Sequence, residues 1–202
     1  MKPDIRFTDR PLEDLWCQAV IVLVFQNPSM KLDVLSSLNE MMTGTMVNIL
    51  ESGRWTGNRS EDFLFAGEDM IKSDKLLFHG LGPISEFSTS LLEQEVWNLG
   101  STLDKLGVND FGIHIPVING LEAEHGSHLE LSAKSLLKRY HDRHKDEPDF
   151  HLRIIFSVDI KFMDILNPVV ESLRSYLDLI PDFSIIIDGN RMEAASEVDG
   201  PK

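Results

Sequence analysis

The residues best suited to binding chemistry lie at positions 79–84, where the sequence is His-Gly-Leu-Gly-Pro-Ile. An apolar run at 76–78 precedes them and a helical pattern of apolar residues follows. Pro83 suits the first position of a helix, and Gly82 suits the cap before it. A glycine turn between strand and helix leaves backbone N–H groups and a positive dipole end, which bind anions. We therefore predict a site for a small anionic ligand at His79, Gly80, Leu81, Gly82, Pro83 and Ile84.

The same turn also has a purely structural explanation. Glycine lets a chain pass close to its neighbours, and many α/β units use it for that reason alone. No third glycine opens the helix, and the sequence has no Walker loop, nucleophile elbow or complete dinucleotide fingerprint. His79 and His114 both lie in apolar stretches, where hydrogen-bonded histidines of the core or its rim are favoured. An anion site and a structural turn both remain open.

A second group of candidate ligands precedes another helical segment. The spacing His-x-x-His places two imidazoles on one side of a first helical turn, with carboxylates nearby, which suits zinc or manganese. The spacing differs from His-Glu-x-x-His, and acidic loops with histidines often precede helices without binding anything. We predict no cofactor, and the alternative is a divalent metal held by Glu122, Glu124, His125 and His128.

Composition narrows the class of partner and the compartment. The chain has 19 Lys and Arg against 33 Asp and Glu, a net charge of −14, which repels nucleic acids and anionic membranes. The single cysteine, Cys17, excludes an intramolecular disulfide and suits a reducing compartment. The longest apolar run, 19–25, is too short to cross a bilayer, and the N-terminus lacks a signal peptide. We expect a cytoplasmic protein that binds neither nucleic acid nor membrane.

Strand-like segments alternate with amphipathic helices. We expect strands at 19–25, 63–66, 76–78, 111–117, 151–158 and 183–187. We expect helices from Asn27–Ser29 to Gly53 with a break at Gly44, from Ile84 to Leu106, from Ser127 (a capping box with Glu130) to Tyr140, and at 162–180. This alternation favours a largely parallel sheet with helices on both faces. We predict one α/β/α domain at 1–188 and a polar tail at 189–202.

The order of these elements resembles the N-terminal domain of the M17 leucyl aminopeptidase family, which has a macro-domain-like fold. Three segments carry the resemblance, which spans roughly residues 15–188: the helix before ESGRWTG at 51–57, LLFHGLGP at 76–83 and LDKLGVNDFGIHIP at 103–116. The resemblance implies a three-layer α/β/α fold with a mostly parallel mixed sheet. In that family catalysis belongs to a separate C-terminal domain with two metals. Its Asn-Thr-Asp-Ala-Glu-Gly-Arg signature is absent from this sequence, so no catalytic residue is carried over.

The resemblance therefore implies a stand-alone relative of a non-catalytic domain, and we predict that it is not an enzyme. It would bind a protein partner, a second copy of itself or a small anionic ligand of nucleotide type. The alternatives are a metal-assisted hydrolase that uses the 122–128 loop and an aminopeptidase-associated subunit. Self-association is expected because the family's domain belongs to an oligomeric peptidase. Adaptable apolar groups of the kind found at interfaces, which could equally be core, are Met41, Met42, Met46, Trp55 and Trp97.

Overall fold

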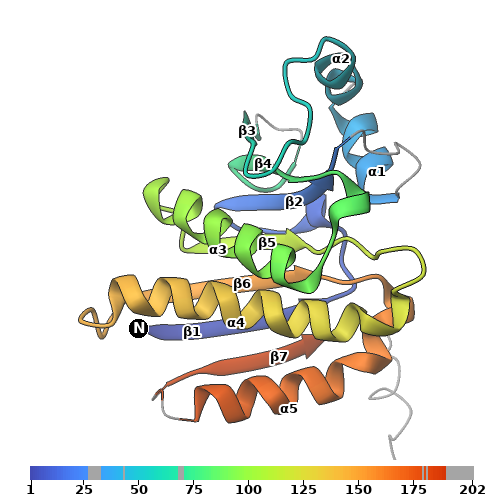
Figure 1. Ribbon diagram of the computed structural model, residues 1–202. Coiled ribbons are helices and arrows are strands. Elements are labelled where there is room, and N and C mark those ends of the chain that lie inside the picture. Colours follow the sequence, from blue (N-terminus) through green and yellow to red (C-terminus); the bar gives the residue numbers. More distant parts are fainter. Residues whose placement is uncertain (27–32, 43, 68–70, 179, 181, 190–202) are drawn as a thin grey trace, which may run out of the picture.

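The computed structural model describes residues 1–26, 33–42, 44–67, 71–178, 180 and 182–189. One seven-stranded sheet runs through it in the order β3-β4-β2-β5-β6-β1-β7 (Figure 1). Its strands are β1 (Lys2–Thr8), β2 (Ala19–Phe25), β3 (Asp62–Ala66), β4 (Lys75–Gly82), β5 (Asp110–His114), β6 (His151–Ser157) and β7 (Ser184–Asp188). In this sheet β3 runs antiparallel to β4 and the other pairings are parallel. The predicted mostly parallel mixed sheet is confirmed.

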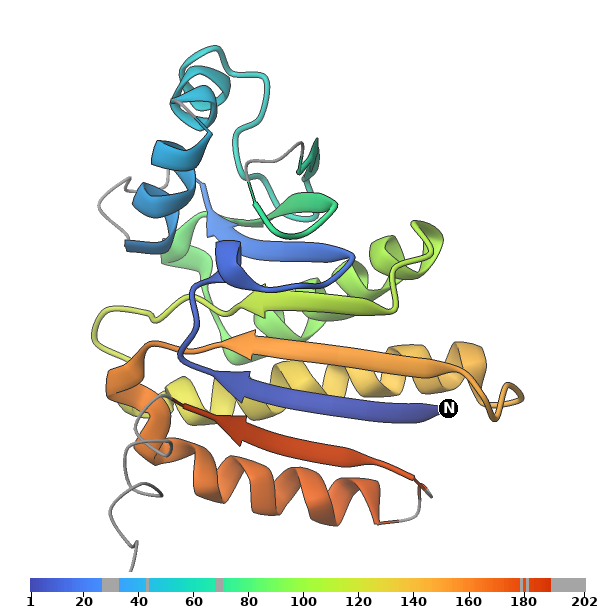
Figure 2. The ribbon, with the colours of Figure 1, turned by 180° about the vertical axis from the view of Figure 1, so that it is seen from behind.

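Helices lie on both faces of the sheet, as Figures 1 and 2 show from opposite sides. One face carries α3 (Thr89–Lys105), α4 (His125–His144) and α5 (Leu166–Leu177), and the other carries α1 (Asp33–Met41) and α2 (Thr45–Glu51). The first layer packs Leu99, Leu136 and Leu173 against the sheet, and the second packs Leu38 and Met46. The three-layer α/β/α architecture is therefore confirmed. The second layer is partial: in Figure 2, β6, β1 and β7 lie in front with no helix over them.

The interior strand β2 separates two hydrophobic cores. Its side chains alternate between them, with Val20 and Val22 in one cluster and Ile21 and Leu23 in the other. A strand covered on both faces buries every side chain, which explains why its sequence is continuously apolar. The described part of the chain contains no helix long and apolar enough to cross a membrane.

The first strand is a correction, because the strands expected from the sequence begin only at residue 19. β1 pairs in parallel with both β6 and β7 and so lies inside the sheet. Its inward side chains, Ile5 and Phe7, are fully buried, whereas Asp4 and Arg6 form an ion pair at 2.8 Å on the other face. Because no helix of the described residues covers that face, the strand alternates polar and apolar residues. This alternation with a period of two was the sequence signal from which β1 could have been predicted.

Three predicted helix starts are also corrected, one of them because α5 begins at Leu166 rather than at 162, after the 3₁₀ turn Ile160–Ile165. Strand β4 continues to Gly82, and a 3₁₀ turn at Ile84–Glu86 separates it from α3, so Pro83 does not begin the helix. Instead Ser88 caps α3, accepting a hydrogen bond from the Leu91 N–H at 3.2 Å. Helix α4 starts at His125 rather than Ser127.

The predicted break at Gly44 is confirmed, because this residue has a φ of 78° and separates α1 from α2. The proposed helix start at Asn27–Ser29 and the tail from residue 190 lie outside the described residues. Met42, Met46 and Trp55 belong to the core, so these three do not form an interface, whereas Met41 is exposed.

Candidate functional site

The connections that follow β2 and β5 lead to opposite faces of the sheet, although the two strands are parallel. These strands are neighbours, but the next helix after β2 is α1 on one face, whereas β5 leads to α4 on the other (Figure 1). In open α/β sheets such a divergence opens a crevice beyond the carboxyl ends of the strands, where ligands bind. A pocket of about 590 Å³ lies at this place, lined also by the segments that follow β1 and β6.

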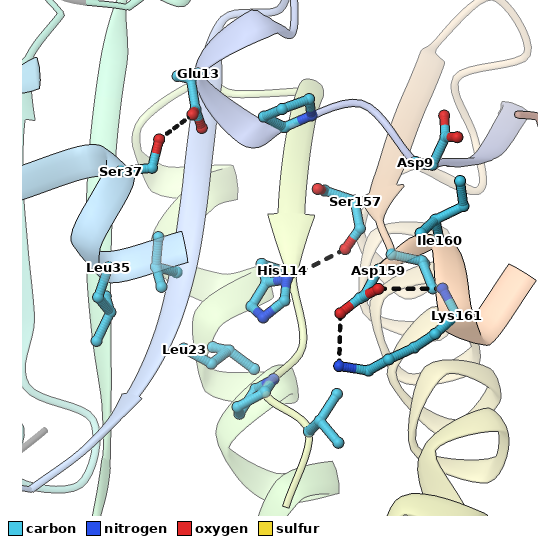
Figure 3. A pocket seen from close by; sticks show the side chains of 15 residues that line it. Asp9, Glu13, Leu23, Leu35, Ser37, His114, Ser157, Asp159, Ile160 and Lys161 are labelled. Atoms are coloured by element: carbon cyan, nitrogen blue, oxygen red, sulfur yellow. Dashed lines mark hydrogen bonds and ion pairs between the residues drawn. The ribbon is translucent and has the colours of Figure 1, made fainter. Parts of the chain in front are cut away.

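The pocket combines apolar walls with converging polar groups (Figure 3). Leu23, Leu35 and Val158 contribute to its apolar walls. Its titratable and hydroxyl side chains include Asp9, Glu13, Ser37, His114, Asp159 and Lys161. An apolar cavity of this size with a few directed polar groups is the usual form of a small-molecule site.

His114 stands at the end of β5 with a defined tautomer. Its Nδ1 lies 3.2 Å from the carbonyl oxygen of Ser157 on the neighbouring strand β6. Because a carbonyl only accepts, Nδ1 carries the proton and donates, and the neutral ring presents a lone pair at Nε2. Burial lowers the pKa of His114, although the Ser157 carbonyl and Asp159 act in the opposite direction. The imidazole is therefore neutral near pH 7.

Asp159 and Lys161 form one unit directly after β6. Asp159 accepts a hydrogen bond from the Lys161 backbone N–H at 3.1 Å and caps the 3₁₀ turn Ile160–Ile165. The Lys161 Nζ lies 2.7 Å from its other carboxylate oxygen. Burial acts to raise the pKa of Asp159, but these contacts outweigh it and the pKa is lowered. The carboxylate is ionised and the ammonium beside it is already engaged.

Glu13 reaches the pocket from the 3₁₀ turn Leu12–Asp14. The hydroxyl of Ser37 on α1 donates to Oε1. The other carboxylate oxygen, Oε2, is buried without a hydrogen-bond partner among the described residues. A buried acceptor that lacks a donor is costly, so this oxygen destabilises the described structure locally.

The predicted ligand residues 79–84 lie elsewhere. His79, 1% exposed, has Nδ1 2.6 Å from Asp62 Oδ1 and Nε2 3.3 Å from Glu95 Oε2. Burial opposes its protonation, but these two hydrogen bonds outweigh it and raise the pKa of His79. The imidazole thus joins β3, β4 and α3. His79 is the hydrogen-bonded core histidine that its apolar sequence surroundings favour.

The glycine turn is occupied by the protein itself. The Gly80 N–H donates to the Glu61 carbonyl at 3.0 Å, and the Gly82 N–H donates to the Gly57 carbonyl at 2.9 Å. A Cβ at position 80 would lie 2.0 Å from the Asn58 carbonyl oxygen, so glycine is required for the close approach. None of the six predicted residues, 79–84, lines the described pocket. The anion site at this turn stays a prediction. It assumed that a helix begins at Pro83, whereas α3 begins only at Thr89.

The predicted metal residues are not brought to one point. Glu122 is exposed and accepts a hydrogen bond from the Gly120 N–H, whereas Glu124 Oε2 lies 4.0 Å from His128 Nε2. His125 and His128 are buried against the rings of Phe162 and Phe87, respectively. Burial, together with His114 and His128, lowers the pKa of His125 to about 4. Across the described residues, no three His, Cys, Asp or Glu side chains are grouped to hold a metal ion.

The pocket's acidic residues are not among those predicted from the sequence. Asp9 follows β1 directly, and Asp159 follows β6 after one intervening residue. The carboxyl ends of parallel strands share one edge of a sheet, so acidic residues just after two such strands are expected to lie near each other. This was the sequence signal from which Asp9 and Asp159 could have been predicted. It could not be used for Asp9 without recognising β1 as a strand.

Comparisons with known proteins identify the fold. No protein-family model matches the chain, and no curated protein is significantly similar in sequence. Among solved structures, a variant of tomato leucine aminopeptidase superposes with a TM-score of 0.60 and 11% identity, over 77% of this chain. The macro domain of ganglioside induced differentiation associated protein 2 gives 0.57 and 12%, over 85% of this chain and 82% of that one.

A Trypanosoma brucei macrodomain solved in complex with ADP-ribose gives a TM-score of 0.54 and 13% identity, over 84% of this chain and 68% of that one. The match to the aminopeptidase covers 32% of that protein, so the chain spans about a third of its length. Identities at this level establish the fold alone. The chain has a macro-domain-like fold, which it shares with macrodomains and with part of leucine aminopeptidase.

Proposed function

We propose that this domain binds a small ligand of nucleotide type in the pocket at the ends of β2, β5 and β6. The observation that carries the proposal is the pocket of about 590 Å³ beyond β2 and β5, where the following connections diverge to opposite faces of the sheet. That volume lies within the usual range of roughly 300–1,000 Å³ for small-molecule sites. The proposal is supported by the similarity to Trypanosoma brucei macrodomains solved with ADP-ribose and with ADP, transferred here as an inference from fold.

Thermal unfolding with a panel of nucleotides that includes ADP, AMP and ADP-ribose tests the proposal. A ligand that binds only the folded state stabilises it by about 2.7 kcal/mol at 100 times its Kd. At least one member of the panel should raise the Tm in a concentration-dependent way. No shift with any member would overturn nucleotide binding.

Two matched variants then locate the ligand. Val117 lines the pocket, and Val117→Trp fills part of the cavity. Ile84, 55% exposed, lies at the glycine turn, and Ile84→Trp crowds that turn instead. We expect Val117→Trp to abolish the shift and Ile84→Trp to preserve it. The reverse pattern would place the ligand at the turn.

A second proposed function is self-association through the sheet face over β6, β1 and β7, which no helix in the described part of the chain covers. Trp16 is 73% exposed, and its carbonyl oxygen accepts a hydrogen bond from Arg153 of β6 on that face. Exposed tryptophan beside arginine is typical of protein interfaces. We propose a second copy of this chain as the partner.

A further inference from the structure

The edge strand β3 is attached to the helix α3 through one carboxylate. In the sheet β3 pairs only with β4, and its residues Phe63 and Phe65 pack into the core on the far side from α3 (Figure 1). Asp62 lies on the side towards α3, where its Oδ2 accepts a hydrogen bond from the Thr102 hydroxyl at 2.8 Å. Its other oxygen, Oδ1, lies 2.6 Å from His79 Nδ1. The attachment of this edge therefore depends on the contacts of Asp62.

His79 links that carboxylate to the interior of the protein. It lies directly opposite Asp62 in the antiparallel pairing of β3 and β4, and its Nε2 lies 3.3 Å from Glu95 Oε2 on α3. In the described structure the charged groups that face the buried ring are Asp62 from β3 and Glu95 from α3, whereas β2 places Leu23 beside it. An imidazolium has two N–H groups, so protonated His79 donates to both carboxylates at once.

Neutral His79 can donate to only one of the two carboxylates, because a neutral imidazole has a single N–H. The side chain of Glu95 is 4% exposed, whereas that of Asp62 is 27% exposed. A buried carboxylate that loses its partner costs more free energy than one that water can reach. The remaining proton therefore stays on Nε2, bonded to Glu95, and Nδ1 turns a lone pair towards Asp62. Two acceptors then oppose each other between β3 and β4.

We propose that His79 is a pH-sensitive latch on the edge strand: protonated, it holds β3 in place through Asp62, and neutral, it releases Asp62 to water and lets β3 open locally from β4. The 57–61 loop stays attached in both states, because Glu95 also bonds the Ser60 hydroxyl at 2.7 Å. An open β3 would leave the backbone groups of β4 free to pair with another extended segment. The latch lies at the β3 edge of the sheet, and none of its residues lines the pocket.

The direction of the switch follows from the surroundings of the imidazole. Burial acts to lower the pKa of His79, but the hydrogen bonds with Asp62 and Glu95 outweigh it and the pKa is raised above 6.5. The latch is therefore closed at pH 6 and opens as the pH rises through the raised value.

Nuclear magnetic resonance titration of His79, combined with amide hydrogen exchange, tests the latch in the unmodified protein. As the pH rises through the midpoint of the His79 titration, the amides that join β3 to β4 should lose about tenfold in protection, the effect of one lost hydrogen bond to a charged group. The amides that join β2 to β5 are the internal reference and should lose less. No titration of His79 between pH 6 and 9, or an equal loss of protection at both strand pairs, would overturn the proposal.

Two variants remove the latch in different ways. His79→Gln has an amide donor for one carboxylate and gains no charge, so the protection of β3 should be low at pH 6 and should not fall further by pH 9. Asp62→Asn places an amide that can accept from Nδ1 or donate to it, so its β3 protection should be equal at the two pH values. This variant leaves Glu95 paired and decides the question if His79→Gln does not fold.

His141→Gln, which replaces an exposed histidine of α4, is the matched control and should keep the full pH dependence of the β3 amides. A loss of β3 protection between pH 6 and 9 that persists in folded Asp62→Asn would overturn the proposal, because the released carboxylate is then absent.

Discussion

Glu95 of α3 places its Oε2 3.3 Å from Nε2 of His79 on β4, and both side chains are almost fully buried. The same carboxylate oxygen accepts a hydrogen bond from the Ser60 hydroxyl at 2.7 Å. On the other side of the imidazole, Oδ1 of Asp62 on β3 lies 2.6 Å from Nδ1 of His79. This network ties the antiparallel edge strand and the loop before it to the helix layer. It gives His79 a structural role.

We predict a pH-dependent stability from this network. The raised pKa of His79 stabilises the fold fully below its ordinary value of 6.5, and that contribution is lost as the pH rises through the raised value. Burial acts to raise the pKa of Glu95, but the hydrogen bonds with His79 and Ser60 outweigh it and the pKa is lowered. The ionised Glu95 therefore stabilises the fold above pH 4.5, and that contribution is lost as the pH falls through the lowered pKa. The pair therefore contributes most between about pH 4.5 and 6.5.

His79→Gln should lower the free energy of unfolding by about 3 kcal/mol at pH 6, because the buried Glu95 carboxylate and the more exposed Asp62 carboxylate both lose their charged partner. The variant's stability should also change less between pH 6 and 9 than that of the unmodified protein. Urea denaturation at several pH values measures both effects. His141→Gln, at an exposed position of α4, is the matched control. Equal pH dependence in His79→Gln and the unmodified protein would contradict this account.

Two glycine substitutions should separate steric crowding from backbone strain. Gly80→Ala places a Cβ 2.0 Å from the Asn58 carbonyl oxygen and should cost about 3 kcal/mol of stability. Gly107 has a φ of 67° and open space where a Cβ would lie, so Gly107→Ala should cost about 1 kcal/mol. Chemical denaturation of both variants gives the comparison. A smaller loss for Gly80→Ala than for Gly107→Ala would show that the 57–61 loop moves away freely.

Cys17 should be slow to alkylate in the folded protein. Burial raises the pKa of its thiol from 9.0 to about 11, so at pH 8 the reactive thiolate is about a hundredfold scarcer than in an unfolded chain. Iodoacetamide labelling followed by mass spectrometry, with and without denaturant, measures the ratio of rates. Equal labelling rates in the two conditions would show that the site is open.

Self-association should depend on Trp16. We expect sedimentation velocity at moderate salt to detect dimer at tens of micromolar protein, and Trp16→Ala to shift the equilibrium towards monomer. The net charge of −14 opposes association, so the dimer should weaken as the salt is lowered. Met41→Ala, at an exposed residue of α1, serves as the control. A monomer at every concentration tested would exclude this proposal.

Local sequence determined most elements of this fold. The apolar run at 19–25 specifies β2 because a strand covered on both faces needs no polar side. Gly44 specifies the break between α1 and α2 because its φ of 78° is unfavourable for other residues. Periodic apolar residues specified α3, α4 and α5, although their first residues shifted. Such features depend on neighbours a few positions away, which a sequence displays directly.

Tertiary structure alone decided where the candidate pocket lies. The sequence places a glycine turn at 80–82, but hydrogen bonds from the distant 57–61 loop extend β4 and occupy that turn. The pocket draws Glu13, His114 and Asp159 from segments far apart in the chain. They meet because parallel strands place their carboxyl ends at one edge, in an order that the strand pairing sets. That pairing depends on contacts across the whole sheet, and no local pattern encodes it.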